Sequence, residues 1–429
     1  MHLGVFVLGT GNHVAGWRHP GAFTSFQDLG VIQQIARTAE RGCFDLIFLG
    51  DSLKAGVYDH PSFTARFEPL TMLAALVPTT RYVGLGATSS TTYGAPFSVA
   101  RAFASLDHLS GGRAAWNAVT SSHADNGGNF GMEHPSHELR YEMANEFVDV
   151  VRGLWDCWDD DAIVADRSTG LYIDPRKVRE LNHVGRFFNV RGPLNIGRCP
   201  QGHPVILQAG ASPPGQELAA RTADVVFSVV QDLEEARRAY SGLKSRLAKY
   251  DRDEDSLKIL PGVMPIIGRT RQEARDLLDR LQSYANQETA LTMLGSRLGQ
   301  DLTHCDLDEP VPDFPLPNGS HGFAGTMLAK ARRERLTLRE LLGLAAAARG
   351  HLVICDTPVG IADTLEEWFV TGAADGFNIL PPLFPSAFDD FVDLVVPELQ
   401  RRGLFRDRYT GATLREHFGL PRPRSRYFS

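Results

Sequence analysis

The sequence predicts a single-domain, parallel (β/α)8 TIM barrel with insertions over the carboxyl-terminal face. Short apolar runs alternate with helical patterns, each run ends in Gly or polar residues, and 429 residues suit a barrel with insertions. The eight expected strands are residues 3–8, 44–49, 82–87, 114–119, 204–209, 224–230, 258–267 and 376–380. Because polar strand ends gather at the catalytic face of such a barrel, they are the first candidates for a site.

The composition disfavours several classes of function. With 44 Lys and Arg against 51 Asp and Glu, the net charge is −7, and no basic run exceeds a doublet, so a nucleic-acid partner is not expected. The five cysteines are scattered without metal-site spacing, which is typical of free thiols in a reducing cytosol. No apolar run approaches the ~20 residues that span a bilayer, and no positively charged segment precedes the apolar start. We therefore expect a cytoplasmic protein with no metal ion and no membrane contact.

The first two strands lead to two candidate site residues. His13 follows a Gly-rich turn after the first strand, where it is either catalytic or a loop residue satisfied by its neighbours. A helix is expected over 29–41, ending at Gly42. Asp51 follows the second strand, and this carboxylate either binds a ligand NH or OH or caps a turn.

The third and fourth strands end in hydroxyl and amide side chains. Residues 88–92 are five consecutive Ser or Thr, including Thr88 and Ser90, which either hydrogen-bond a heterocycle or form a turn. The strand at 114–119 is apolar apart from Asn117 and runs into Thr120 and Ser121. A helix over 96–109 connects the two strands, with a proline in its first turn.

The strongest helical pattern covers 137–158. His137 and Tyr141 are four residues apart in its first turns and project to the same side, near the third and fourth strand ends. After the fifth strand, Gly210 and Ser212 precede a helix, an arrangement that suits a phosphate group. The pattern is neither a Walker motif nor a dinucleotide fingerprint.

Two insertions and a tail complete the chain. Residues 159–203 have no clean period and are expected to cross the barrel mouth, and residues 285–370 are expected to contain a helical lid. The tail, residues 401–429, is polar and basic, so we expect an arm that packs on a neighbouring subunit or stays loose.

Seven sequence blocks, in this order and spacing, resemble the bacterial-luciferase-like flavin monooxygenases. They are FLGDS at 48–52, GRAAWNAVTS at 112–121, RYEMANEF at 140–147, GPLN at 192–195, PQG at 200–202, QAGAS at 208–212 and DGFNI at 375–379. The most similar branch contains nitrilotriacetate, dibenzothiophene-sulfone and long-chain alkane monooxygenases. The resemblance spans most of residues 1–400.

The resemblance implies an enzyme that uses reduced FMN (FMNH2) from a separate NAD(P)H:flavin reductase, together with O2. Such an enzyme inserts one oxygen atom into a small organic substrate through a flavin C4a-(hydro)peroxide, and it forms a homodimer or homotetramer. A dry, lidded pocket that contains hydrogen-bond donors suits this chemistry.

The resemblance also assigns roles to individual residues. It places Asp51, Thr88 and Ser90 near the flavin, and Asn117 and Ser121 under the isoalloxazine. His137 and Tyr141 match positions near the phosphate and ribityl chain, Gly210 and Ser212 match the phosphate loop, and His13 matches a histidine proposed to assist oxygenation. The chain is shorter between His13 and Trp17 than the alkane enzyme is.

Two other functions are compatible with the fold. One is an F420-dependent oxidoreductase, which the block at 116–121 and the long insertions disfavour. The other is a flavin-binding protein without turnover, which the presence of His13, Asp51 and Asn117 disfavours.

Overall fold

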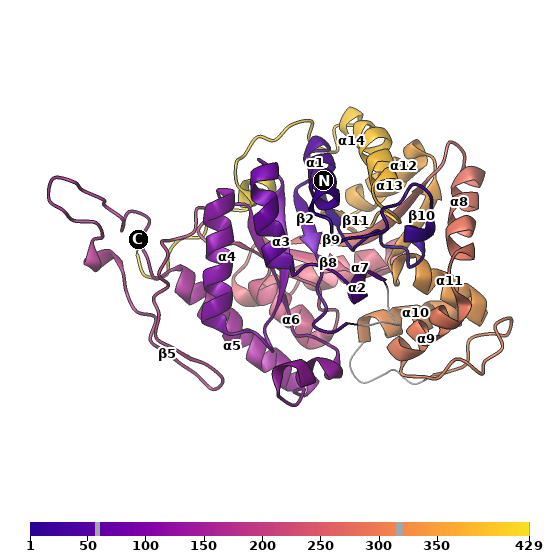
Figure 1. Cartoon of the computed structure of the whole chain (residues 1–429), viewed down its shortest axis with the longest axis horizontal. Coiled ribbons are helices and arrows are strands. Elements are labelled where there is room, and N and C mark those ends of the chain that lie inside the picture. Colours follow the sequence, from indigo (N-terminus) through magenta and orange to yellow (C-terminus); the bar gives the residue numbers. More distant parts are fainter. Residues whose placement is uncertain (56–60, 315–320, 429) are drawn as a thin grey trace.

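The computed structural model describes residues 1–55, 61–314 and 321–428, and it contains a closed barrel of eight parallel strands (Figure 1). The order around the barrel is β11-β1-β2-β3-β4-β7-β8-β9, and β9 pairs with both β8 and β11 to close it. The strands are β1 His2–Phe6, β2 Leu46–Leu49, β3 Gly84–Ser90, β4 Ala114–Val119, β7 Val205–Gln208, β8 Val225–Ser228, β9 Lys258–Ile267 and β11 Gly376–Ile379. The predicted barrel is confirmed.

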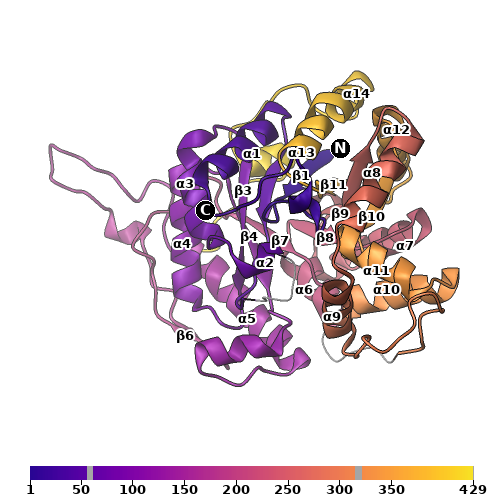
Figure 2. The ribbon, with the colours of Figure 1, turned by 45° about the vertical axis from the view of Figure 1, so that its right-hand side comes forward.

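Helices surround the barrel on its outside, as Figures 1 and 2 show from two directions. They are α1 Leu29–Arg41, α3 Pro69–Leu76, α4 Pro96–Ser110, α5 His137–Trp155, α6 Pro213–Thr222, α7 Leu233–Lys244, α8 Arg271–Ser283, α12 Pro358–Val370, α13 Ser386–Asp390 and α14 Val396–Arg401. Local sequence fixes their ends. The Asp28 carboxylate accepts the Gly30 N–H at the start of α1, for example, and Ser136 caps α5 by accepting from Leu139.

Strand β4 separates the hydrophobic core from the barrel interior. Trp116 points outward and packs against Phe103 of α4 and against Phe147 and Trp155 of α5, with ring centroids 6.0, 5.8 and 6.3 Å away. Since successive strand residues face opposite sides, Asn117 points into the barrel. The packing of Trp116 therefore fixes the direction of Asn117.

The sheet has a ninth strand that the sequence did not predict, β10 Leu352–Asp356. It pairs in parallel with the carboxyl-terminal half of β9, from Val263 to Ile267. The ten-residue β9 is longer than the strands beside it in the barrel, so β10 satisfies backbone groups that would otherwise form an open edge.

The first insertion lies along the outside of the barrel. It begins at the end of α5, and because helices run opposite to the strands of a barrel, this end is at the amino-terminal side. His183 and Glu146 of α5 are 3.0 Å apart, and the Gln201 amide donates to the Ala114 carbonyl at the start of β4 at 2.8 Å. The prediction that 159–203 covers the mouth is wrong, because a segment that follows a helix starts at the opposite end of the barrel.

The second insertion contains three helices, α9 Gln287–Leu298, α10 His321–Glu334 and α11 Leu338–Ala348, which share a small apolar cluster. The Val14 N–H in the loop after β1 donates to the Ala346 carbonyl of α11 at 3.0 Å, so this helix lies at the carboxyl-terminal face. Residues 315–320, which are part of this insertion, lie outside the described residues. Among the helices that are described, none is both long and apolar enough to cross a membrane.

The tail folds back on its own barrel and fills the amino-terminal end. Leu414 and Phe418 are fully buried there, and the Arg415 guanidinium donates to the Asp224 carboxylate at 2.8 Å. The Tyr409 hydroxyl donates to the Phe44 carbonyl at 2.7 Å. The expectation of a loose arm or an arm packed on a neighbour is wrong, because the tail carries the apolar residues that close this end of the barrel.

Candidate active site at the barrel mouth

Two adjoining cavities open at the carboxyl end of the barrel. The mouth cavity, of about 370 Å³, lies over the strand ends, and the side cavity, of about 290 Å³, lies between β7, β8 and the helices that follow them. They share the lining residues Thr120, Ser122, Tyr141, Ala209, Gly210 and Phe227. Together they are large enough for a ligand of cofactor size.

The mouth cavity has an apolar half. Phe6, Phe48 and Phe227 project from β1, β2 and β8, with ring centroids 5.0 to 5.7 Å apart. Its opposite half carries polar groups, which are Thr88, Asn117 and Gln208 from β3, β4 and β7. A flat ring system with one apolar and one polar end matches this division.

Two buried polar atoms of the polar half have no hydrogen-bond partner among the described residues. They are Oδ1 of Asn117 and Nε2 of Gln208, on side chains that are 4% and 3% exposed. Asn117 Nδ2 donates to Thr88 Oγ1 at 2.8 Å, and Thr88 Oγ1 donates to the Leu49 carbonyl at 2.8 Å. Since buried polar groups are nearly always paired, the two orphaned atoms indicate a ligand with both a donor and an acceptor.

The hydroxyl-rich end of β3 forms a turn and lines the cavity as well. Ser90 Oγ accepts the N–H groups of Thr92 and Tyr93, each at 3.1 Å, and it also accepts from Ser121 Oγ at 2.8 Å. Ser90 and Ser121 line the mouth cavity. The turn is therefore confirmed, and hydrogen bonding of a heterocycle by this segment stays a prediction.

Asp51 lies at the rim of the mouth cavity in an ion pair that the sequence did not indicate. Its carboxylate is 3.2 Å from the Arg66 guanidinium, which also donates to the Gly50 carbonyl at 3.1 Å. Burial raises the pKa of Asp51 above its usual value, and Arg66 opposes this shift. Asp51 is thus positioned by a neighbouring cation.

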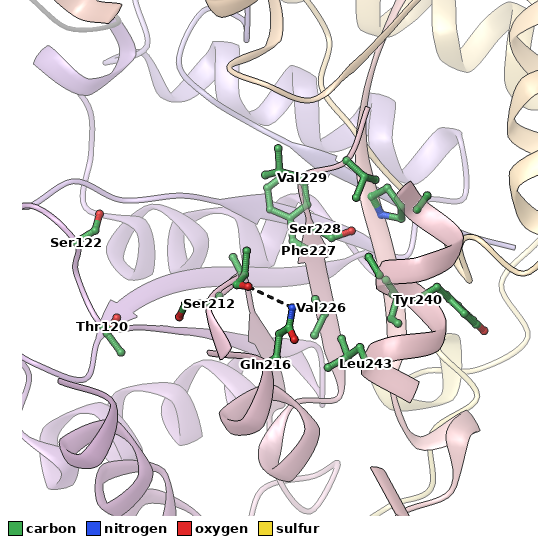
Figure 3. Close-up of a pocket in the computed structure, with 18 of the residues that line it drawn as sticks. Thr120, Ser122, Ser212, Gln216, Val226, Phe227, Ser228, Val229, Tyr240 and Leu243 are labelled. Carbon is green, nitrogen blue, oxygen red and sulfur yellow. Dashed lines mark hydrogen bonds between the residues drawn. The ribbon is translucent and has the colours of Figure 1, made fainter. Parts of the chain in front are cut away.

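The junction of the two cavities is suited to an anion. Ser212, labelled in Figure 3 among the residues that line the side cavity, caps α6 by accepting the Gly215 N–H at 3.3 Å. The Tyr141 hydroxyl oxygen fills the space beside two glycines, so that a Cβ at Gly210 or Gly215 would lie 3.0 or 2.9 Å from it. The adjacent His137 ring lies 5.0 Å from the Tyr141 ring.

A buried cation, Arg140, lines the side cavity beside Tyr141 and His137. Helix α6 begins with Pro213 and Pro214, which have no N–H, so an anion here must be bound largely by side chains and by N–H groups before the helix. Arg140 supplies the opposite charge, although sequence reasoning did not select it.

Nine of the ten predicted site residues line one of the two cavities, and His13 does not. The ring Nδ1 of His13 accepts the Ala15 N–H at 3.1 Å, and the backbone N–H of His13 donates to the Pro382 carbonyl at 3.1 Å. Burial lowers the pKa of His13 to about 4, so the ring is neutral at pH 7. The surrounding loops hold His13 beside the site and outside its lining.

The second insertion contributes two cavity residues that the sequence did not indicate. The Arg349 guanidinium lies 5.1 Å from the Phe6 ring centroid, and the His351 ring stacks on Phe227 at 4.8 Å and 13°. Burial lowers the pKa of His351 to about 3. Among the described residues, no group of three or more His, Cys, Asp or Glu side chains could hold a metal ion.

Comparison with known proteins identifies the family. Residues 1–367 match the model of the luciferase-like monooxygenases. The chain belongs to this family. It is 48% identical to N-acetyl-S-(2-succino)cysteine monooxygenase of Bacillus subtilis (strain 168), with 99% of this chain and 98% of that protein covered. It is 45% identical to nitrilotriacetate monooxygenase component A of Aminobacter aminovorans, with 99% and 97% covered.

Solved structures of luciferase-like monooxygenases and their relatives agree with this assignment. DmoA from Hyphomicrobium sulfonivorans superposes with a TM-score of 0.88 at 32% identity, with 97% of this chain and 92% of that chain covered. Riboflavin lyase (RcaE), solved with modified FMN and substrate riboflavin, superposes with a TM-score of 0.87 at 29% identity, with 98% and 96% covered. The predicted family and the prediction of a monooxygenase are confirmed.

Proposed function

We propose that this chain is the oxygenase of a two-component system, which takes reduced FMN from a separate NAD(P)H:flavin reductase and uses O2 to oxygenate a small organic substrate. The observation that carries the proposal is the divided mouth cavity joined to an anion site. The isoalloxazine has an apolar dimethylbenzene end and a polar pyrimidine end, and its ribityl chain ends in a phosphate. The structure of RcaE with modified FMN supports the choice of flavin.

The residues present fit this cofactor. Asn117 and Gln208 would bind the ring edge, with Thr88 holding the Asn117 amide, while Asp51 and Ser121 lie at the rim of the same cavity. Around the junction, Tyr141, His137, Ser212, Gly210 and Arg140 would hold the ribityl phosphate.

The bound dihydroflavin supplies the oxygen chemistry, and the protein supplies orientation and a dry environment. The three phenylalanine rings exclude water from the apolar half of the cavity. The neutral His351 ring, stacked on Phe227, extends this surface. The proposed help from His13 would require movement of its loop, since the ring does not line the cavity.

The substrate that we propose carries at least one carboxylate. Arg349 places a cation at the mouth cavity, and two relatives are named for N-acetyl-S-(2-succino)cysteine and nitrilotriacetate, which both carry carboxylates. The test is a substrate panel that begins with S-succinylated thiols and aminopolycarboxylates. A generic flavin reductase supplies FMNH2, and mass spectrometry detects a gained oxygen atom or a cleaved product. A panel that yields only H2O2 would favour a flavin-binding protein without turnover.

The F420-dependent alternative has its own test. Anaerobic titrations of the protein with FMNH2 and with reduced F420 compare the two cofactors directly. We expect binding of FMNH2 and weak binding of F420, because the three phenylalanine rings suit the dimethylbenzene end of FMN, whereas the corresponding end of F420 carries a hydroxyl group. Preference for F420 would replace the monooxygenase proposal.

The purified chain should not oxidise NADH with added FMN in the absence of a reductase. The sequence has no dinucleotide fingerprint, and one relative is named as component A of its system. The measurement is NADH absorbance over time, with a generic flavin reductase added as the positive control. Steady consumption of NADH by this chain alone would contradict the two-component proposal.

We further propose a cytoplasmic homodimer or homotetramer. The segment at 162–174, in the first insertion, reaches away from the barrel (Figure 1) and exposes several apolar side chains. These are Ile163, Val164, Leu171 and Tyr172, which are 43–66% exposed. Such an apolar surface on a projecting segment is typical of subunit contacts.

Charged substitutions on this segment should shift the protein to a smaller species. Val164→Asp with Leu171→Asp places two carboxylates on the exposed surface, and light scattering after size exclusion measures the mass. The matched control is Val370→Asp with Leu394→Asp, at exposed apolar residues of α12 and of the turn before α14. An unchanged mass in the first variant would place the subunit contact elsewhere.

A further inference from the structure

The orientation of one side-chain amide in the mouth cavity is fixed by its neighbours. The Thr88 hydroxyl has a single hydrogen, and that hydrogen is donated to the Leu49 carbonyl at 2.8 Å. A carbonyl oxygen can only accept, so Thr88 Oγ1 has only a lone pair left for Asn117. The Asn117 amide must therefore turn its NH2 group to Thr88, at 2.8 Å.

The consequence is an obligate acceptor inside the cavity. The Asn117 side chain lines the mouth cavity. Its Oδ1 is buried and has no hydrogen-bond partner among the described residues. Thr88 and Asn117 are direct cross-strand partners on β3 and β4, which fixes their separation. A ligand must offer an N–H or O–H to this oxygen, because the amide cannot turn over without losing its bond to Thr88.

A flavin has two ring N–H groups that are relevant here, at N3 and at N5. The N3–H is present in both redox states, whereas N5 carries a hydrogen only in the dihydroflavin and a bare lone pair in the oxidised form. The anion site at Tyr141 and Ser212 lies at the starts of α5 and α6, the helices that follow β4 and β7. In the flavin ring N5 lies next to the C4 carbonyl of the pyrimidine end, so a flavin whose pyrimidine end occupies the polar half of the mouth cavity can present N5 to Asn117.

We propose that Asn117 selects the reduced flavin, with Oδ1 accepting the N5–H and with Thr88 as the positioning residue that prevents the amide from turning. The inference rests on the proposed function, since it requires a flavin in the mouth cavity. Oxidised FMN places the N5 lone pair against the Oδ1 lone pair and is disfavoured. This selection lets the oxygenase take FMNH2 in the presence of FMN and release FMN to the reductase.

The first test compares dissociation constants of FMN, titrated in air, and of FMNH2, titrated anaerobically. Wild-type protein should bind FMNH2 roughly tenfold to hundredfold more tightly than FMN, which corresponds to one hydrogen bond gained and one repulsion avoided. Thr88→Val keeps the shape and removes the hydroxyl, so the Asn117 amide can turn and donate to N5 of oxidised FMN. The ratio of the two constants should then fall about tenfold or more, mainly through tighter binding of FMN.

Two variants are controls. Thr88→Ser retains the hydroxyl and should restore the wild-type ratio. Thr91→Val removes a hydroxyl from the same turn, where it donates to the Val119 carbonyl at 3.1 Å and does not contact Asn117, so the ratio should stay unchanged. A Thr88→Val variant in which both constants change by the same factor would overturn the proposal, since Asn117 would then face an atom common to both redox states.

The second test leaves the protein unchanged. Oxidised 5-deaza-FMN has a C–H in place of N5 and lacks its lone pair, so wild-type protein should bind it more tightly than FMN. Equal affinities would overturn the proposal even if Thr88→Val does not fold. If neither FMN nor FMNH2 binds, the proposed function fails. If both bind equally well, the proposed function remains and only the selection by Asn117 is lost.

Discussion

Reduced FMN should bind about 10²- to 10⁴-fold more weakly when Ser212 is replaced by Ala and Tyr141 by Phe together, whereas reduced riboflavin should lose much less. Each substitution removes a hydroxyl at the junction of the two cavities. A hydrogen bond to a charged group contributes about 1.5–3 kcal/mol, and two such losses give this range of affinity. Anaerobic fluorescence titration with both ligands measures the difference.

The control must separate the phosphate contact from a general loss of helix stability. Ser212 also caps α6, and the loss of a cap costs about 1 kcal/mol. Thr270→Ala removes an equivalent cap, which accepts the Glu273 N–H at 3.1 Å at the start of α8. This control should leave both affinities unchanged. Equal losses of FMNH2 and riboflavin in the double variant would show that the two hydroxyls do not contact the phosphate.

The sequence predicted the strand-end residues well, because local pattern determines their direction. Asn117 interrupts an apolar strand, so its neighbour Trp116 packs outward and the amide points inward. Gly210 and Ser212 precede a helix after a strand, which is a local signal of an anion site. The barrel follows from eight repetitions of the same unit.

Residues that reach the cavity through long-range packing were not predictable in this way. Arg349 and His351 line the mouth only because the second insertion returns to the barrel before β10, and no local period indicates this. His13 was placed in the site from its position after β1, yet its loop packs against Pro382, far away in sequence. The strand β10 was missed because its stability comes from pairing with β9.

The free energy of unfolding should fall steeply as the pH drops from 6.5 toward 4. Buried histidines cause this, since burial lowers the pKa of His13 and His203 from 6.5 to about 4, that of His351 to about 3, and that of His417 below its usual value. At His203, the Asp156 carboxylate, 2.8 Å away, only partly opposes the effect of burial. Below pH 6.5 the unfolded chain binds a proton at each position and the folded chain does not. Stability that is present above pH 6.5 is therefore lost as the pH falls.

Carboxyl groups whose pKa is raised by burial act in the opposite direction, and Asp107 is one of them. Burial raises the pKa of Asp107 from 3.8 to about 6, so the folded chain binds a proton there before the unfolded chain does. Asp45 and Asp224, whose pKa values are lowered, add acid sensitivity only below 3.8. Near pH 5, His13, His203 and His351 each favour the unfolded state by one proton and Asp107 favours the folded state by one, so these four groups alone contribute a slope of about 2.7 kcal/mol per pH unit.

Removing one buried histidine should reduce this slope by about 1.4 kcal/mol per pH unit. The variants are His351→Gln and His13→Gln, studied without flavin by urea unfolding at several pH values between 7.5 and 4.5, a range chosen to span roughly the titration of free histidine. The matched control is His304→Gln, on a side chain that is 89% exposed. Both buried variants should lose stability at pH 7.5 through altered packing, but they should lose less on acidification than wild type does. A slope that stays at the wild-type value in both variants would assign the acid sensitivity to other groups.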